Sequence, residues 1–331
     1  MIISRTPFRI SFFGGGTDYP AWYNEHGGAV LSTTINKYCY ITARYLPPFF
    51  DYNYRIRYSL REETKKISQI KHPSVRECLT YLDFDRGVEI QHNSDLPAGI
   101  GIGSSSAFTV GLLHVLYALK GKIVTKRQLA LEAIIIEQEK IKENVGSQDQ
   151  TSAAFGGFNR IEFDSQHTIQ VKPITLTTKK IENFQNYLML FFTGFPRTAS
   201  EIADEQIKKI PDRKKELNKM LEMVDESTDI LNSSDSNLKD FGKLLNDAWM
   251  IKRSLTHRIS TPTIDKIYKD ALSAGALGGK LLGAGGGGCI LFFVEPEKQE
   301  RVKKKLKNLL YIPFNLENLG SQIVYYSSDV E

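Results

Sequence analysis

Cysteine is scarce in this sequence, and the few present are not arranged for disulfides or zinc. Cys39, Cys78 and Cys289 are widely spaced and odd in number, and no CxxC pair occurs. This excludes a disulfide framework and a zinc knuckle. The histidines form no HExxH or HxH pattern, which argues against a zinc hydrolase. We expect the protein to work in a reducing cytoplasm.

Long hydrophobic runs are also missing. Apolar stretches such as Leu188–Phe192 and Cys289–Val294 are far shorter than the ~18 residues that a membrane span requires. The first five residues, MIISR, lack the ordered charge, apolar core and cleavage site of a signal peptide. We therefore expect a cytoplasmic location and no membrane partner.

Charge of one sign is in small excess. The 43 basic and 38 acidic residues leave a net charge of +5. Lysines cluster at 303–307, but Val302, Leu306 and Leu309 interrupt them at helical spacing, which is typical of a solvated helix face. We expect no nucleic-acid partner, whereas a small anionic substrate fits the charge balance. The oligomeric state stays open, a homodimer included.

What is present is a chain of 331 residues, long enough for roughly two domains. Its first 60 residues read as strands, residues 146–157 are small and polar, and residues 200–272 are mostly helical. Further strands are expected at 88–92, 158–163, 187–192, 289–294 and 323–326, and further helices at 73–82, 106–119, 125–142 and 296–310. Composition shifts from strand-rich to helix-rich near residue 195, so we predict domains over 1–185 and 186–331.

The segment Leu96-PAGIGIGSSS-Ala107 carries the strongest chemical signal. Its alternating glycines let the backbone bend toward a ligand, and its serines open an apolar helix. The free N–H groups at a helix start attract anions. This pattern predicts a phosphate cradle, and the serine hydroxyls could also reach a magnesium ion.

Two familiar nucleotide motifs do not fit. No GxxxxGK[ST] sequence occurs, so this is not a P-loop protein. Gly283, Gly285 and Gly288 match GxGxxG, but a strand follows them where a dinucleotide fold requires a helix. The segment KLLGAGGGGC at 280–289 is better interpreted as a turn where the backbone closely approaches a substrate or a phosphate.

Two further places carry charge beside glycine. In FRISFFGGGTDYP, Arg9 and Asp18 flank a triple glycine. This arrangement suits the binding of a sugar, because a carboxylate can accept hydrogen bonds from sugar hydroxyls. It suits a surface ion pair beside a hairpin turn equally well. Between residues 137 and 150, Glu137, Glu139 and Asp149 offer carboxylates for magnesium and for an attacking hydroxyl. Asp149 stands out because its neighbours are small and uncharged.

Together, in this order and spacing, the three glycine segments resemble the GHMP kinase superfamily. The resemblance implies an α+β, two-domain fold: an N-terminal domain with a left-handed βαβ unit and a ferredoxin-like C-terminal domain. It also implies a kinase that uses ATP and Mg²⁺ in the cleft between the domains.

The resemblance further implies residue roles. Asp149 would face the substrate hydroxyl, Arg9 would stabilise it, and Ser105 and Glu137 would bind magnesium, although the triple serine leaves the choice of serine open. The nucleotide-binding residues would be Pro97, Gly99, Gly101, Gly103, Ser104, Ser105 and Ser106. The substrate-binding residues would be Gly15, Gly16, Thr17, Asp18, Gly285, Gly286 and Gly287, with Arg197 a candidate for a substrate phosphate or an ordinary surface arginine.

Within the superfamily, FGGGTDYP and QDQTSAAFGGFN are similar to the branch of heptose 7-phosphate kinases and fucokinase-type sugar kinases. The length is similar to that of the simple heptose kinases. The implied reaction is phosphorylation of the anomeric hydroxyl of heptose 7-phosphate by ATP, on the route to GDP-heptose. The alternatives are another GHMP acceptor, such as fucose, galactose or an isoprenoid intermediate, and a non-catalytic sensor that binds sugar and ATP.

Overall fold

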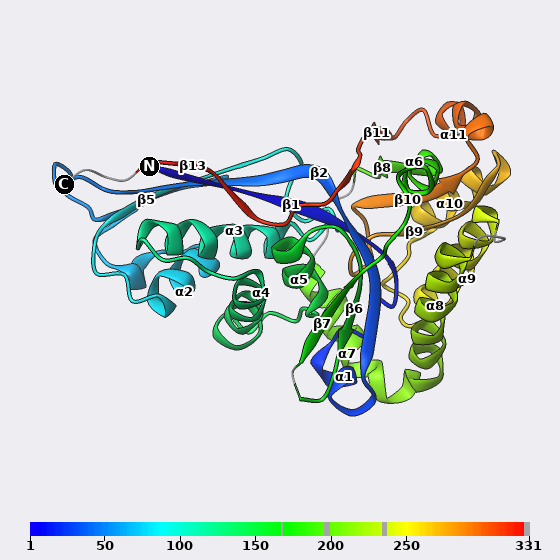
Figure 1. Cartoon of the computed structure of the whole chain (residues 1–331), viewed down its shortest axis with the longest axis horizontal. Coiled ribbons are helices and arrows are strands. Elements are labelled where there is room, and N and C mark those ends of the chain that lie inside the picture. Colours follow the sequence, from blue (N-terminus) through cyan, green and yellow to red (C-terminus); the bar gives the residue numbers. More distant parts are fainter. Residues whose placement is uncertain (167, 195–198, 234–236, 328–331) are drawn as a thin grey trace.

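Two β-sheets with helices packed against them make up the protein (Figure 1). The computed structural model describes residues 1–166, 168–194, 199–233 and 237–327. The expected α+β class is confirmed. No helix in these ranges is both long and apolar enough to cross a membrane.

The first sheet has nine strands and is organised around β2, which is 18 residues long. One half of β2 pairs with β6 and the other with β5, while β1 runs antiparallel along most of its length. The strands are β1 (Ile2–Phe13), β2 (Gly28–Tyr45), β3 (Tyr54–Arg57), β4 (Arg61–Thr64), β5 (Val88–Ser94), β6 (Phe158–Phe163), β7 (Ile169–Pro173), β12 (Leu316–Glu317) and β13 (Gln322–Tyr326). The β-branched and aromatic residues of β2 suit so long a strand.

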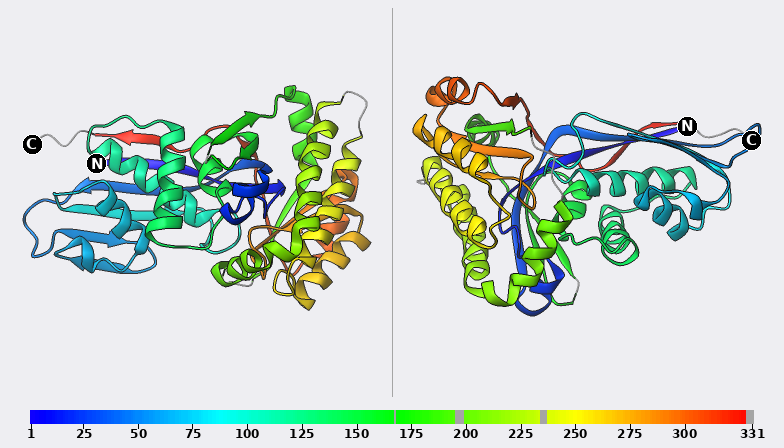
Figure 2. Two further views of the ribbon diagram at one scale, coloured as in Figure 1. Left: turned by 90° about the horizontal axis from the view of Figure 1, so that it is seen from below. Right: turned by 180° about the vertical axis from the view of Figure 1, so that it is seen from behind.

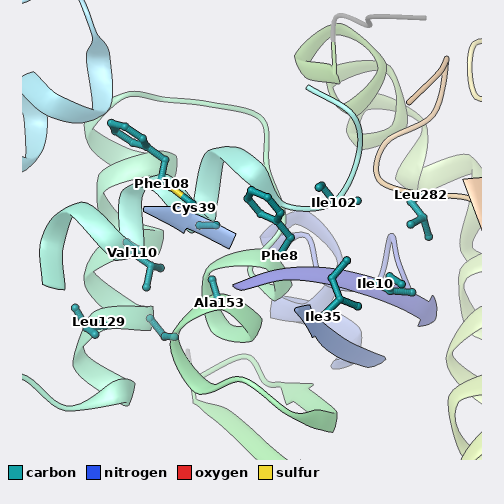
Figure 3. Close-up of a cluster of buried hydrophobic side chains, with 14 of the residues drawn as sticks. Phe8, Ile10, Ile35, Cys39, Ile102, Phe108, Val110, Leu129, Ala153 and Leu282 are labelled. Atoms are coloured by element: carbon teal, nitrogen blue, oxygen red, sulfur yellow. The ribbon is translucent and has the colours of Figure 1, made fainter. Parts of the chain in front are cut away.

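Helices cover one face of this sheet (Figure 2). They are α2 (Pro73–Tyr81), α3 (Ser104–Leu119), α4 (Lys126–Ile134) and α5 (Gln148–Phe155). α3 packs against both β1 and β2, and most of its side chains are buried. In Figure 3, Phe8 and Ile10 of β1, Ile35 of β2 and Val110 of α3 belong to one apolar cluster. The sheet and α3 therefore hold the residues at the start of α3 rigidly.

Parallel pairing occurs between β3 and β5, with β4 and α2 in the connection. This is the βαβ arrangement that the resemblance implies.

Two sequence expectations are corrected in this half of the chain, and one segment without a predicted element forms a helix. The first 60 residues contain a helix, α1 (Pro20–His26), which starts at a proline and buries Trp22 and Tyr23. The small, polar stretch near 150 forms α5, whose polar residues are buried against neighbouring elements. The helix expected to reach residue 142 is α-helical only to Ile134 and then π-helical over Ile135–Lys140.

The second sheet is antiparallel with the order β11-β8-β10-β9. Its strands are β8 (Leu188–Phe192), β9 (Ala276–Leu281), β10 (Cys289–Val294) and β11 (Leu310–Ile312). Helices lie between β8 and β9 and between β10 and β11, which gives the βαββαβ order of a ferredoxin-like unit. The first connection contains α7 (Ala199–Lys209), α8 (Lys214–Asn232), α9 (Leu238–Ser254) and α10 (Pro262–Ser273), and the second contains α11 (Gln299–Lys305), while α6 (Thr178–Asn186) precedes β8.

Close backbone contact explains a strand that the glycine-rich sequence concealed. A Cβ atom on Gly278 of β9 would lie 2.0 Å from the carbonyl oxygen of Gly242 in α9.

The helix expected over 296–310 is shorter, because the chain enters β11 at Leu310. Beyond β11 the chain returns to the first sheet, where β13 pairs with β1. The domain boundary at residue 185 stays a prediction.

Candidate active site

Three glycine loops, far apart in the sequence, meet around one cleft. In chain order, the first loop is residues 8–20, the second is 96–107 and the third is 280–289. The backbone of residues 96–107 is fixed from two sides: Arg9 N donates to Ile102 O at 3.0 Å, and Cys289 N donates to Ile100 O at 2.8 Å. A Cβ atom on Gly288 would lie 2.4 Å from Ile100 O, so only glycine permits this approach. The cleft has a volume of about 1060 Å³ and is lined by parts of all three loops.

The second loop presents its glycines and serines to the cleft. Gly99, Gly101 and Gly103 have φ angles of 76°, 85° and 74°, a region that other residues rarely adopt. Gly103 is the N-cap of α3, so the free N–H groups of a 16-residue helix begin here. The predicted nucleotide-binding residues Pro97, Gly99, Gly101, Gly103, Ser104, Ser105 and Ser106 all line the cleft.

Arg9 and Asp149 form a two-pronged ion pair in the cleft. Arg9 Nε donates to Asp149 Oδ1 at 2.7 Å, and Arg9 Nη2 donates to Asp149 Oδ2 at 2.6 Å. Arg9 Nη1 donates to the carbonyl of Gly101 at 2.6 Å, which ties the pair to the second loop. The Arg9 side chain is 4% exposed and that of Asp149 is 25% exposed. The carboxylate is thus held rigidly while part of it still faces the cleft.

Glu137 lies in the π-helical segment and is fully buried. Its Oε2 accepts from Ser106 Oγ at 2.8 Å and from Gln150 Nε2, while its Oε1 has no hydrogen-bond partner. Burial raises the pKa of Glu137 to about 7. Ser105, the serine expected to share a metal with Glu137, is exposed, whereas Ser106 contacts the carboxylate.

Glu137 does not itself line the cleft, whereas Ser105 and Ser106 do. The unpartnered carboxylate oxygen of Glu137 beside the Ser106 hydroxyl has the donor chemistry that suits Mg²⁺, which binds through one or two protein oxygens plus substrate phosphates. Within the described ranges, no group of three or more His, Cys, Asp or Glu side chains could hold a metal by themselves.

The first loop brings Asp18 to the cleft. Asp18 is buried, and its Oδ1 accepts from Gly16 N at 2.8 Å. A Cβ atom on Gly146 would lie 1.9 Å from Asp18 Oδ2. Burial raises the pKa of Asp18, and the negative charge of Asp149 raises it further. Gly15 and Gly16 line the cleft with Asp18.

Not every predicted substrate residue faces the cleft. Thr17 is buried, and its hydroxyl donates to the carbonyls of Gly14 and Ala29. In the third loop, the cleft is lined by Gly283 and Ala284, not by the predicted residues Gly285, Gly286 and Gly287. Arg197 lies outside the described residues.

The third loop packs against Ile259, which lies in the connection between α9 and α10. A Cβ atom on Gly285 would lie 2.7 Å from Ile259 Cα, and Gly286 N donates to Ile259 O at 2.9 Å.

The structure adds polar cleft residues that sequence reasoning did not single out. Lys252 of α9 is buried and donates to Gly283 O at 2.5 Å. Gln206 of α7 donates to Ala284 O at 2.7 Å. Both lie on helices with an ordinary amphipathic pattern, so the sequence carried no signal for them. Gln148 also lines the cleft. For this residue the sequence did carry a signal, because Gln148 is the first residue of the QDQ motif.

Two segments of the chain match models of one known protein family. Residues 70–157 match the family model described as GHMP kinases N terminal domain, and residues 229–312 match that of GHMP kinases C terminal. Together these matches cover just over half of the chain.

Among individual relatives, the D-glycero-alpha-D-manno-heptose 7-phosphate kinase of Campylobacter jejuni is 29% identical, covering 92% of this chain and 93% of that protein. A galactokinase of Pyrococcus furiosus is 25% identical, covering 91% of each chain. The crystal structure of a D-glycero-D-manno-heptose 1-phosphate kinase from Bacteroides thetaiotaomicron superposes with a TM-score of 0.74 at 24% identity, covering 99% of this chain and 100% of that one.

Proposed function

We propose that this chain, which belongs to the GHMP kinase family and is an ATP-dependent phosphotransferase, phosphorylates the anomeric hydroxyl of D-glycero-D-manno-heptose 7-phosphate. The product would be the 1,7-bisphosphate, on the route to GDP-heptose. The coarser statement, a GHMP kinase similar to sugar kinases, rests on the family models and on the relatives described above.

The observation that carries the proposal is the Arg9–Asp149 pair beside the start of α3. Phosphate groups bound at the free N–H groups of α3 would lie next to Arg9, which bridges Gly101 O and Asp149. Asp149 would accept a hydrogen bond from the acceptor hydroxyl and either take its proton or only orient it. Arg9 would stabilise the negative charge on the transferring phosphoryl group.

Glu137 and a serine at the start of α3 would hold Mg²⁺. When bound, the ion neutralises charge on the phosphates of ATP. Gln150 donates to Glu137 and would fix the orientation of this carboxylate. The exposed Ser105 and the buried Ser106 are both within the first turn of α3, and either hydroxyl could complete the pair.

Two features support a heptose phosphate as the acceptor. The similarity to the Campylobacter heptose kinase extends over nearly the whole length of both chains. Asp18, buried at the cleft beside Gly16, would accept hydrogen bonds from sugar hydroxyls. A second candidate is a different GHMP sugar kinase, because galactokinases and fucokinases are also among the relatives.

A coupled ADP-release assay across a panel of acceptors tests the proposal. The panel contains heptose 7-phosphate, free heptose, fucose, galactose and mevalonate, each with ATP and Mg²⁺. We expect kcat/KM for heptose 7-phosphate to exceed that for free heptose by roughly 10²-fold, because cations built to hold a phosphate are left unpaired without it. Equal or greater activity with fucose or galactose would refute the heptose assignment. Activity with mevalonate alone would refute a sugar kinase.

A further inference from the structure

Three polar side chains converge in front of Gly15, where the first loop lines the cleft. A Cβ atom on Gly15 would lie 3.6 Å from Ser11 Oγ, 3.8 Å from Gln148 Nε2 and 4.0 Å from Lys252 Nζ. These side chains come from β1, α5 and α9, which are far apart in the sequence. Gly15, Gln148 and Lys252 line the cleft, whereas Ser11 does not. We call Ser11, Gln148 and Lys252 the Gly15 subsite.

Two members of the Gly15 subsite carry polar atoms without partners. Ser11 is 4% exposed and Gln148 is 9% exposed. Ser11 Oγ and Gln148 Oε1 are buried and make no hydrogen bond within the protein. Buried polar groups in native proteins are nearly always paired, and each exception calls for an explanation. Two such atoms beside one point of a substrate cleft indicate groups that a ligand satisfies.

The polar groups around the Gly15 subsite include both donors and acceptors, and this mixture suits a hydroxyl. Gln148 presents its donor Nε2 toward Gly15 and also carries the unpaired acceptor Oε1, whereas the Lys252 ammonium is a donor only. The buried carboxyl group of Asp18 interacts electrostatically with Lys252 and with Asp149. A phosphate dianion would bring its oxygens against these acceptors. A sugar hydroxyl donates to one neighbour and accepts from another, so it satisfies both kinds of group.

We infer that the Gly15 subsite binds a second hydroxyl of the acceptor sugar, beside the one that is phosphorylated, and thereby selects the sugar. The inference rests on the proposed function as a sugar kinase, but it does not depend on that sugar being a heptose phosphate. The neighbouring position of Gln148 and Asp149 at the start of α5 keeps the selected hydroxyl close to the reacting one.

Ser11→Ala and Gln148→Met test the inference with the acceptor that the panel identifies. We expect the KM for the acceptor to rise about 10-fold or more, because the matching sugar hydroxyl loses its partner. The KM for ATP should stay unchanged. Each variant removes an unpaired buried polar atom, so the melting temperature without ligands should not fall. The increase in melting temperature that the acceptor causes should shrink.

Gln170→Met is the matched control, because Gln170 is exposed on β7 and does not line the cleft. Gly15→Ala is a second, independent variant. Gly15 does not have a positive φ angle, and the nearest atom to its added methyl group would be 3.6 Å away. The variant should fold, and its methyl group should fill the space of the bound hydroxyl, so that the acceptor KM rises while the ATP KM is kept.

Deoxy analogues of the acceptor provide the readout that a merely structural role would not change. The wild-type enzyme should discriminate against one analogue that lacks a single ring hydroxyl, and Gln148→Met should lose that discrimination. Unchanged acceptor KM values in Ser11→Ala and Gln148→Met, with wild-type discrimination among the analogues, would overturn the inference. A preference for another sugar would refute only the heptose assignment, whereas a wild-type enzyme that phosphorylates no sugar would refute both proposals.

Discussion

Asp149→Asn perturbs the ion pair at the centre of the cleft. In the wild-type protein the guanidinium of Arg9 donates to both carboxylate oxygens of Asp149. Asparagine keeps one acceptor oxygen but turns an NH₂ group toward this guanidinium. One charge-assisted hydrogen bond is lost, and a cation that is 4% exposed loses its counter-charge. The hydrogen bond from Arg9 to Gly101 O is unaffected, so the fold and the nucleotide loop should persist.

The expected cost follows from these contacts. A hydrogen bond to a charged group contributes about 1.5–3 kcal/mol, and breaking a buried ion pair costs about 3–5 kcal/mol. Because the Asp149 side chain is 25% exposed, solvent screens part of this loss. We therefore expect the free energy of unfolding to fall by about 2–3 kcal/mol. Turnover should fall by on the order of 10²-fold or more, as for a lost base or orienting group.

Urea denaturation and the coupled ADP-release assay measure both effects, with Asp51→Asn as the control at an exposed loop position. ATP binding should be retained in Asp149→Asn. Near-normal turnover in this variant would place Asp149 away from the acceptor hydroxyl and refute the reasoning. A slow enzyme with an unchanged pH profile would show that Asp149 orients the hydroxyl rather than taking its proton.

Four further outcomes are expected. Glu137→Gln should raise the Mg²⁺ concentration needed for half-maximal turnover and lower kcat; full activity at low Mg²⁺ would exclude Glu137 as the ligand. Chelation by EDTA should abolish phosphoryl transfer, and added Mg²⁺ should restore it; transfer that continues in EDTA would exclude a magnesium requirement. Gly288→Ala, whose Cβ would lie 2.4 Å from Ile100 O at a φ of 100°, should lower the free energy of unfolding by about 2–4 kcal/mol. In Gly99→Ala the added Cβ atom would have no other atom within 4 Å, so this variant should lose only about 1–2 kcal/mol, which is what a positive φ angle costs alanine. Equal losses of unfolding free energy for the two variants in urea denaturation would contradict the close contact between Gly288 and Ile100. Burial lowers the pKa of His114 from 6.5 to about 4, so between these two pH values the unfolded chain binds more protons than the folded one. The free energy of unfolding should therefore fall with falling pH in this range, by up to about 1.4 kcal/mol per pH unit. His114→Gln should reduce this pH dependence in denaturation curves.

Local sequence determined much of the secondary structure and the nature of the second loop. The β-branched and aromatic residues of 28–45 specify a strand in almost any compact fold. Glycines at 99, 101 and 103 followed by serines predict a bent backbone before a helix start, which the positive φ angles and the start of α3 at Ser104 confirm. These features depend on neighbours within a few residues, and a linear pattern records such neighbours.

The tertiary structure decided which distant groups meet. Buried packing makes a helix of residues 148–155, where small, polar residues concealed it, and close approach to α9 makes a strand of the glycine-rich residues 276–281. Ser106 rather than Ser105 contacts Glu137, because the rotation of α3 about its axis is set by its packing on the first sheet. Lys252 reaches the cleft only through the docking of α9, and Ser11 and Gln148 meet it only because β1 and α5 pack together. Contacts across more than 100 residues depend on this packing of sheets and helices, which no local pattern encodes.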